Sequence, residues 1–292
     1  MDDYSHSEKR YPLMKLDSDT LDSLDAYLTA IEQDKDINII VAWVMGSHAH
    51  GVADAESDID VRYVFVEDRF NYISLSKRTK SRRYTGTTIA QGVPFGDVMR
   101  DTDIEFMGWN VNRFLGLLGG REDGNNPSAI ECLASPYTLR THPAIPELKE
   151  YVESHYNVIE LFNHYRGFAK KNWYRYIESG RDPTAKRMLY VLRAVLFGEY
   201  VRHVKRIPPL DLRAFLAHAP ESVLDGIRTE TVEDLIDLKT SGKGDEPIEK
   251  EQYAEFVESF ITQTIDYPAL VREETLDKSE LDQYFERIIN TA

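Results

Sequence analysis

The sequence predicts an α+β protein whose first half holds the strands and whose second half is helical. Two stretches, Asn38 to Met45 and Asp58 to Val66, are rich in β-branched and apolar residues and have the length of strands. From residue 157 to 204 the apolar residues recur every three or four positions, as in amphipathic helices. A proline-containing connection separates the two patterns. We therefore expect one domain over residues 1–145 and a helical domain over 146–292.

Within the first half, helices and strands are assigned from the spacing of the apolar residues. Leu24, Leu28 and Ile31 lie three or four positions apart, which places them on one face of a helix. The run from 38 to 45 is almost continuously apolar, as expected for a strand that is buried on both faces. The expected elements are a helix over about 17–34, strands over 38–45, 58–66 and 97–106, and helices over 108–119 and 126–134.

The second half is expected to consist almost wholly of helices. Two long helical patterns come first, and Pro208 with Pro209 ends the second of them. The loop that contains Gly242 and Gly244 is expected to be flexible. The expected helices cover about 157–179, 183–204, 211–218, 221–228, 231–239, 248–265 and 276–290, with the flexible loop at 241–245.

The bulk composition is that of a globular protein. Of the 292 residues 42% are hydrophobic, and no run is long and apolar enough to span a bilayer, so we expect no membrane association. The single cysteine, Cys132, excludes an intramolecular disulfide framework, which makes the cytoplasm the expected compartment. The net charge of −15 argues against a surface covered by nucleic acid but not against a local basic groove.

The residues that carry chemistry lie at and after the end of the first strand. Gly46 and Ser47 follow that strand, and Asp58 and Asp60 open the second one. Because side chains alternate along a strand, the two carboxylates point the same way and repel each other. A divalent cation, Mg²⁺ or Mn²⁺, relieves this repulsion, with phosphate oxygens completing its shell. The Gly-Ser turn offers free N–H groups and a hydroxyl to a phosphate.

The loop between these two strands holds further polar residues. His48 and His50 have no cysteine or third histidine near them in the sequence, so a zinc site is disfavoured. The two histidines are instead expected near an anionic substrate. Asp54 and Glu56 are expected to be solvated carboxylates, and Ser57 is expected to be a turn hydroxyl.

A strand followed by Gly-Ser and then by Asp-x-Asp at the start of the next strand resembles the nucleotidyltransferase superfamily typified by DNA polymerase beta. It resembles in particular the YcgL/RlaP-like group associated with RNA repair, whose pattern is Gly-Ser-x-Ala-x-Gly-x-Ala-x-x-x-Ser-Asp-x-Asp-Val-Arg. The residues that match in register are Gly46, Ser47, Ala49, Gly51, Ala53, Ser57, Asp58, Asp60, Val61 and Arg62. The resemblance implies a polymerase-beta-type mixed sheet with flanking helices in residues 1–145, and a helical domain in 146–292 that closes over the nucleotide.

The resemblance also implies a third catalytic carboxylate on a later strand. The family places it before a Gly-Trp-Asp helix start, and Gly108-Trp109-Asn110 occupies that place, so Glu105 is the matching position. The sequence departs from the family pattern here, because Glu replaces Asp and Asn follows the Trp. Asp103, on the same strand face, is the reserve candidate. Asp58, Asp60 and Glu105 are therefore the expected catalytic residues and metal ligands.

The helical half carries a second set of matches. Lys186, Tyr190 and Arg193 share one helix face and match a family Lys-x-x-x-Tyr-x-x-Arg pattern, and Lys171 lies where the family has a Lys/Arg-Asn pair. Cations beside an aromatic ring suit a triphosphate and a stacked base. An aromatic core flanked by surface charge is the alternative. The expected nucleotide-binding residues are Gly46, Ser47, Arg62, Lys171, Lys186, Tyr190 and Arg193.

Two basic features have more than one interpretation. Arg62 lies on the strand face of Asp58 and Asp60, where it would either pair with a carboxylate or reach a phosphate. The run Lys77–Arg83 holds five cations in seven positions of an otherwise acidic chain. It is either a solvated face or a contact for phosphate or nucleic acid.

The resemblance implies a metal-dependent transferase that moves a nucleoside monophosphate from an NTP, such as ATP, to an acceptor hydroxyl and releases pyrophosphate. The acceptor implied by the family is an RNA end, which the run Lys77–Arg83 would contact. A protein hydroxyl, as in AMPylating antitoxin-like enzymes, and a small molecule are alternatives. A non-catalytic nucleotide-binding module is a further alternative, supported by the Glu at 105. The sequence does not indicate which NTP is used or the oligomeric state.

Overall fold

The computed structural model describes residues 16–73, 83–86, 104–119 and 127–292. Within these residues one five-stranded sheet has the order β3-β4-β2-β1-β5. Its strands are β1 (Asn38–Met45), β2 (Ile59–Val66), β3 (Arg83–Gly86), β4 (Ile104–Asn110) and β5 (Thr138–Thr141). The described helices are α1 (Ser18–Lys35), α2 (Gly46–Ala49), α3 (Phe70–Ile73), α4 (Val111–Leu118), α5 (Pro127–Leu133), α6 (Ala144–His155), α7 (Val158–Asn172), α8 (Ala185–Val204), α9 (Leu212–His218), α10 (Glu221–Leu224), α11 (Thr229–Leu238), α12 (Glu251–Thr262), α13 (Tyr267–Leu270) and α14 (Lys278–Thr291), with π-helical turns η2 (Trp173–Glu178) and η3 (Lys239–Lys243).

The sheet is mixed, which confirms the predicted α+β class. β1 pairs antiparallel with β2 and with β5, β2 pairs parallel with β4, and β3 pairs antiparallel with β4. The antiparallel register places Met45, the last residue of β1, opposite Asp60. The parallel register places Asp60 opposite Glu105. The sheet therefore brings the end of β1 and two of the predicted carboxylates together at one end of the central strands.

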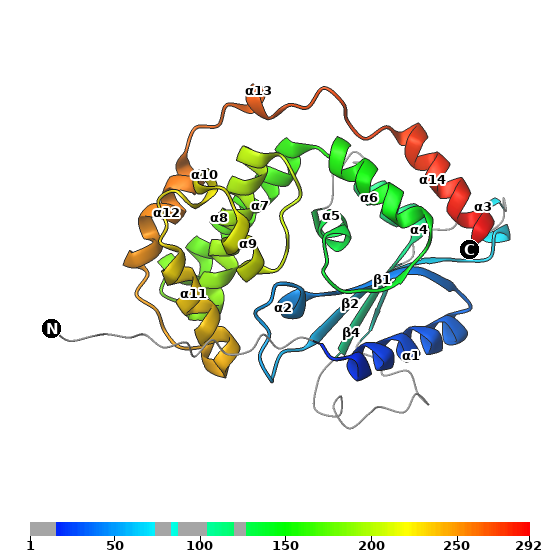
Figure 1. The fold of residues 1–292 in the computed structure, drawn as a ribbon, viewed down its shortest axis with the longest axis horizontal. Helices are drawn as coiled ribbons and strands as arrows, with labels where there is room; N and C mark the ends of the chain where they lie inside the picture. Colours follow the sequence, from blue (N-terminus) through cyan, green and yellow to red (C-terminus); the bar gives the residue numbers. More distant parts are fainter. Residues whose placement is uncertain (1–15, 74–82, 87–103, 120–126) are drawn as a thin grey trace.

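The two faces of the sheet pack against different layers (Figure 1). α1 covers one face, where Leu24 and Leu28 form a compact core with Val61 and Phe65. Because side chains alternate, the residues at even positions of β2 point to the other face. That face belongs to a larger core, which runs from Val64 into the helical half. Asp60 therefore faces the helices of the second half and not α1.

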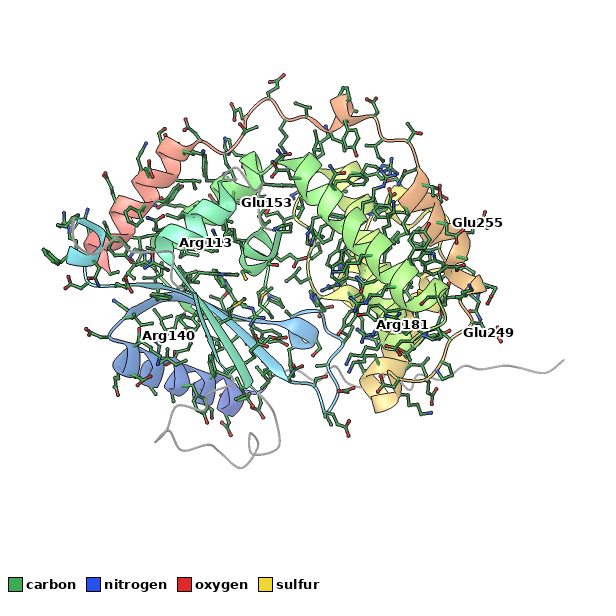
Figure 2. All side chains as sticks on the ribbon, turned by 180° about the vertical axis from the view of Figure 1, so that it is seen from behind. Arg113, Arg140, Glu153, Arg181, Glu249 and Glu255 are labelled. Carbon is green, nitrogen blue, oxygen red and sulfur yellow. The ribbon has the colours of Figure 1, made fainter. Side chains whose placement is uncertain are left out.

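β5, at one edge of the sheet, is tied to α1 by one arginine. Arg140 Nε donates to Asp25 Oδ1 at 2.5 Å, and its NH1 group donates to Glu32 Oε2 at 2.9 Å. Figure 2 shows Arg140 beside α1, and it shows Glu249 and Glu255 at the surface near α12. Charges that face solvent on the outer helices thus contribute to the acidic balance of the chain without entering the core.

The helical half and the sheet half share one continuous hydrophobic core. α7 and α8 lie side by side, with Phe162 of α7 and Phe197 of α8 fully buried in the larger core. The same core includes Trp109 of β4 and Val64 of β2. The division into domains at residue 145 stays a prediction.

Several predicted boundaries are corrected by the structure. β4 continues to Asn110, so the helix expected from Gly108 begins at Val111 instead. The reason is a helix cap: the Asn110 side chain accepts a hydrogen bond from the backbone N–H of Asn112 at 3.0 Å. The loop at 241–245 was expected to be flexible, but its first three residues belong to the turn η3. Residues 97–103 of the predicted third strand lie outside the described residues.

None of the helices in the described part of the chain combines the length and the apolar character needed to cross a membrane.

Candidate functional site

The Gly46–Ser47 bend lies directly against Asp60. Gly46 begins α2 with φ of 63°, a backbone conformation that residues with a Cβ adopt rarely. A Cβ at Gly46 would also collide with the Asp60 carboxylate. The Ser47 hydroxyl is buried and has no hydrogen-bond partner among the described residues, although it lines a cavity. Glycine at 46 thus permits close contact between bend and carboxylate, and Ser47 keeps an unused donor there.

The carboxylates of the two neighbouring strands form an acidic cluster. Asp60 and Glu105 face each other across β2 and β4, and Arg62 lies between them. The Arg62 guanidinium is 3.4 Å from Asp60 and 3.7 Å from Glu105. Burial raises the pKa of Asp60, and the charges of Asp58 and Glu105 raise it further, while Arg62 opposes them. Arg62 is therefore shared between two carboxylates.

The cluster opens into a cavity of about 380 Å³ between the sheet and the helical half. The sheet side contributes the bend, the loop after it and the first carboxylates, and the helical side contributes three cations and an aromatic ring. The predicted residues that line the cavity are Gly46, Ser47, Asp58, Asp60, Lys186, Tyr190 and Arg193. Residues 46 and 193 are far apart in sequence, so this cavity forms where the fold brings α8 and η3 to the bend after β1.

Arg193 is held in place by His50. The His50 Nδ1 atom lies 3.3 Å from the Leu210 carbonyl oxygen, which only accepts, so Nδ1 carries the proton. His50 Nε2 then accepts a hydrogen bond from Arg193. Burial lowers the pKa of His50 well below its usual value, and the charge of Arg193 lowers it further, so the ring is neutral. The Arg193 guanidinium also lies 6.0 Å from the centre of the Phe197 ring. Both contacts orient it.

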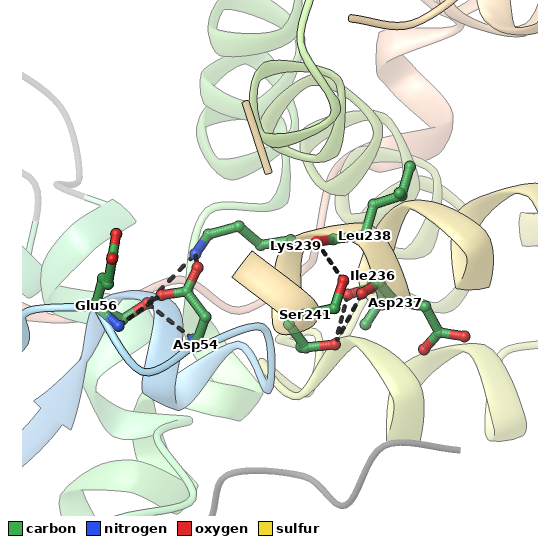
Figure 3. A network of polar contacts seen from close by, with 9 residues as sticks. Asp54, Glu56, Ile236, Asp237, Leu238, Lys239 and Ser241 are labelled. Atoms are coloured by element: carbon green, nitrogen blue, oxygen red, sulfur yellow. Dashed lines mark hydrogen bonds and ion pairs between the residues drawn. The ribbon is translucent and has the colours of Figure 1, made fainter. Parts of the chain in front are cut away.

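A second cross-link joins the two halves at Lys239, a residue that sequence reasoning missed (Figure 3). Lys239 Nζ donates to Asp54 Oδ2 and lies 3.3 Å from Ser57 Oγ. Ser57 Oγ in turn donates to Asp54 Oδ1 at 2.7 Å. Asp54 was expected to be solvated, but its side chain is only 13% exposed. No local signal predicts this pair, because its partners are 185 residues apart.

These features agree with the comparisons to known proteins. A family model described as the RNA repair pathway DNA polymerase beta family matches residues 22–287. The chain belongs to the RNA repair pathway DNA polymerase beta family. It is also similar to the uncharacterized protein YcgL of Bacillus subtilis (strain 168), with 25% identity over 252 residues that cover 82% of this chain and 83% of that protein.

Membership of the RNA repair pathway DNA polymerase beta family implies a polymerase beta-like nucleotidyltransferase-type enzyme of RNA repair. The family match covers the sheet, the bend, the carboxylates and α8, and it ends within α14. The resemblance predicted from the Gly-Ser and Asp-x-Asp motifs is therefore confirmed.

Other predicted residues of this family member do not line the cavity. Arg62 pairs with Asp60 and Glu105, and Glu105 is half exposed beside the cavity. Lys171 is exposed on α7. Asp103 and residues 77–82 of the basic run lie outside the described residues. For Arg83, the last residue of that run, the structure describes the backbone alone. The catalytic and binding roles assigned to all of these residues stay predictions.

The donor chemistry of the acidic cluster fits a divalent cation. Asp58 and Asp60 present hard oxygen donors to one cavity, and the pKa of Asp60 is raised chiefly by burial, which a bound cation would offset. Among the described residues, no three acidic, histidine or cysteine side chains already form a metal-binding group. Mg²⁺ is usually held by one or two carboxylates together with substrate phosphates, so Asp58 and Asp60 would hold it and a phosphate would complete its shell.

Proposed function

We propose that this protein transfers a nucleoside monophosphate from an NTP to an acceptor hydroxyl and releases pyrophosphate. The observation that carries the proposal is the cavity itself, in which Asp58 and Asp60 face Lys186 and Arg193. A phosphate chain needs cations along its length, and the reacting phosphorus needs carboxylates that hold metal ions. A cavity with an acidic side and a basic side supports both requirements at once.

Each wall of the cavity has its own task in the proposed reaction. Lys186 and Arg193 bind phosphate oxygens, and Arg193 enters already oriented by His50. The Tyr190 ring offers a face on which a base stacks. Ser47 donates its unused hydroxyl to a phosphate oxygen, and Gly46 lets that phosphate approach the backbone.

The chemical step requires alignment more than acid or base strength. The acceptor oxygen attacks the α-phosphorus in line, the bond to the bridging oxygen breaks, and pyrophosphate leaves with that oxygen. Asp58, Asp60 and Glu105 would hold divalent cations, which would supply positive charge to the triphosphate and lower the pKa of the acceptor hydroxyl. The carboxylates themselves hold the reacting groups at the end of the central strands, where β2 and β4 fix their spacing.

We propose an RNA end as the acceptor, because the family description refers to RNA repair. An RNA acceptor makes many phosphate contacts, so transfer should fall steeply as salt is raised, whereas transfer to a small molecule should change little.

The test is incubation with each α-labelled NTP, Mg²⁺ or Mn²⁺, and a panel of RNA ends, proteins and small molecules. The double variant Asp58→Ala/Asp60→Ala serves as the blank. Transfer of label to an RNA end, absent from the blank and suppressed by salt, supports the proposal. Transfer to protein or to a small molecule would overturn the acceptor alone. Absence of nucleotide binding by the wild-type protein would overturn the proposed function.

A further inference from the structure

Lys239 is a buried cation to which no motif assigns a role. The residue is 7% exposed and begins the π turn η3, yet its side chain lines the same cavity as Lys186 and Arg193. Taking an ammonium group out of water is costly unless an anion accompanies it. Asp54 supplies that anion, and its side chain is itself largely buried. This pair is therefore built into the cavity wall and is not a surface ion pair.

The ammonium group of Lys239 has more N–H donors than it has acceptors among the described residues. It has three N–H groups, and among the described residues only Asp54 and Ser57 accept from it. Asp54 is already shared, because it also accepts from the Ser57 hydroxyl and from the backbone N–H of Glu56. An oxygen of a cavity ligand would complete the set of partners around Lys239.

The backbone around Lys239 holds its side chain in that position. Gly244 lies so close to the Lys239 stem that a Cβ there would be 2.6 Å from Lys239 Cδ. The Gly244 carbonyl accepts a hydrogen bond from the backbone N–H of Lys186 at 2.7 Å. η3 is thereby fixed to the start of α8, and Lys239 is fixed beside Lys186.

We propose that Lys239 binds the terminal phosphate of the triphosphate, and that Asp54 holds its ammonium group in place before the nucleotide arrives. This inference rests on the proposed function. The reacting α-phosphate must lie against Asp58 and Asp60. Lys239 pairs with a different carboxylate, on the loop before them, and lines the same cavity, so the proposal assigns it to a phosphate other than the α-phosphate.

The experiment compares nucleotides of different phosphate number. Calorimetry measures binding of the α,β-methylene analogue of each NTP with Mg²⁺, and then of the matching nucleoside diphosphate and monophosphate. Lys239→Met removes the charge and keeps most of the stem. Lys243→Met is the matched control, since Lys243 belongs to the same turn, is 60% exposed on its side chain and does not line the cavity. The expected result is a loss of triphosphate affinity of about 10- to 100-fold in Lys239→Met, with monophosphate affinity unchanged. Lys243→Met should match wild type.

A structural role for Lys239 predicts a different pattern. If Lys239 only ties the two halves together, Lys239→Met weakens all three nucleotides equally, and that result would overturn the inference, as would no loss at all. Asp54→Asn tests the second half of the proposal, because it removes the anion that holds the Lys239 ammonium group in place. It should weaken triphosphate binding by about threefold or more and leave monophosphate binding unchanged. Triphosphate binding that is unchanged or tighter in Asp54→Asn would contradict the role of Asp54.

Two outcomes separate this inference from the proposed function. If the wild-type protein binds none of the four triphosphates, the proposed function fails. If it binds one and Lys239→Met binds it equally well, the inference alone fails. Should Lys239→Met not fold, Lys239→Arg, which keeps the charge and should keep triphosphate affinity within about threefold, and Asp54→Asn still decide.

Discussion

The two walls of the cavity take their residues from different kinds of structure. The acidic wall, with Asp58 and Asp60, comes from one strand start and the bend before it, so its residues are close in sequence. The basic wall combines Lys186 and Arg193 of α8 with Lys239 of η3. The acidic wall is rigid because hydrogen-bonded strands fix it, and the basic wall depends on how the helices pack over the sheet. Substitutions in the two walls should therefore have different effects.

The largest effect is expected at the acidic wall. Asp60→Asn keeps the size of the side chain and removes the charge that holds a cation, so transfer should fall by at least about 10³-fold while the protein stays folded. Transfer of label from α-labelled NTP measures the loss, and circular dichroism checks the fold. Asp22→Asn, on the exposed side of α1, is the control and should leave transfer unchanged. Transfer retained by Asp60→Asn would contradict the assignment of Asp60 as the residue that holds a cation.

The basic wall should affect binding more than chemistry. Lys186→Met should weaken NTP binding by about 10- to 100-fold, because a charge-assisted contact to phosphate is lost. Lys149→Met should change binding by less than about threefold, because Lys149 is exposed on α6 and does not line the cavity. Equilibrium binding of a non-hydrolysable triphosphate measures both. Equal losses in the two variants would mean that the nucleotide extends beyond this cavity.

How far the sequence predicts each wall follows from the same difference. Gly46, Ser47, Asp58 and Asp60 were found because a strand and a turn impose fixed spacings that remain visible in a single sequence. The helix face of Lys186 and Arg193 was found for the same reason. The pairing of Lys239 with Asp54 was not found, because it depends on how η3 packs against a loop of the first half.

Boundaries show the same limit on a smaller scale. Gly108 was assigned to a helix start, but hydrogen bonds to β2 and β3 keep it in β4, and Asn110 then caps the helix. Glycine and tryptophan do not reveal by themselves which neighbour they will pair with. A partner strand, once present, overrides the local preference.

The contact between the walls can be tested at His50. His50→Leu removes the acceptor for Arg193 and the donor to the Leu210 carbonyl, so it should weaken triphosphate binding by about 5- to 10-fold and cost roughly 1–3 kcal/mol of stability. His50→Gln offers an amide donor and acceptor in the same place and should recover part of the binding. A purely structural role for His50 predicts recovered stability without recovered binding. Urea unfolding and equilibrium binding on both variants separate the two roles.

The smallest effect concerns the folding stability that the buried Asp60 carboxylate costs when no cation is bound. The pKa of Asp60 is raised in the folded protein, chiefly by burial and then by the charges of Asp58 and Glu105. The folded state therefore holds the Asp60 proton more tightly than the unfolded state, and ionisation of Asp60 lowers stability as the pH rises from the ordinary carboxyl pKa through the raised value. Above the raised value the whole cost is present.

Asp60→Asn removes that cost, so without divalent cations it should be more stable than wild type at pH 7 by the order of 1 kcal/mol, and the difference should shrink as the pH falls below the ordinary value. Comparing the two proteins by urea unfolding at each pH cancels the opposite contribution of Asp54, whose pKa is lowered by its hydrogen bonds to Lys239 and Ser57 in spite of burial. Mg²⁺ should stabilise wild type and leave Asp60→Asn unchanged, because only the ionised pair attracts the cation. Equal stabilisation of both proteins by Mg²⁺ would place the cation elsewhere and leave the acidic wall without the role assigned to it.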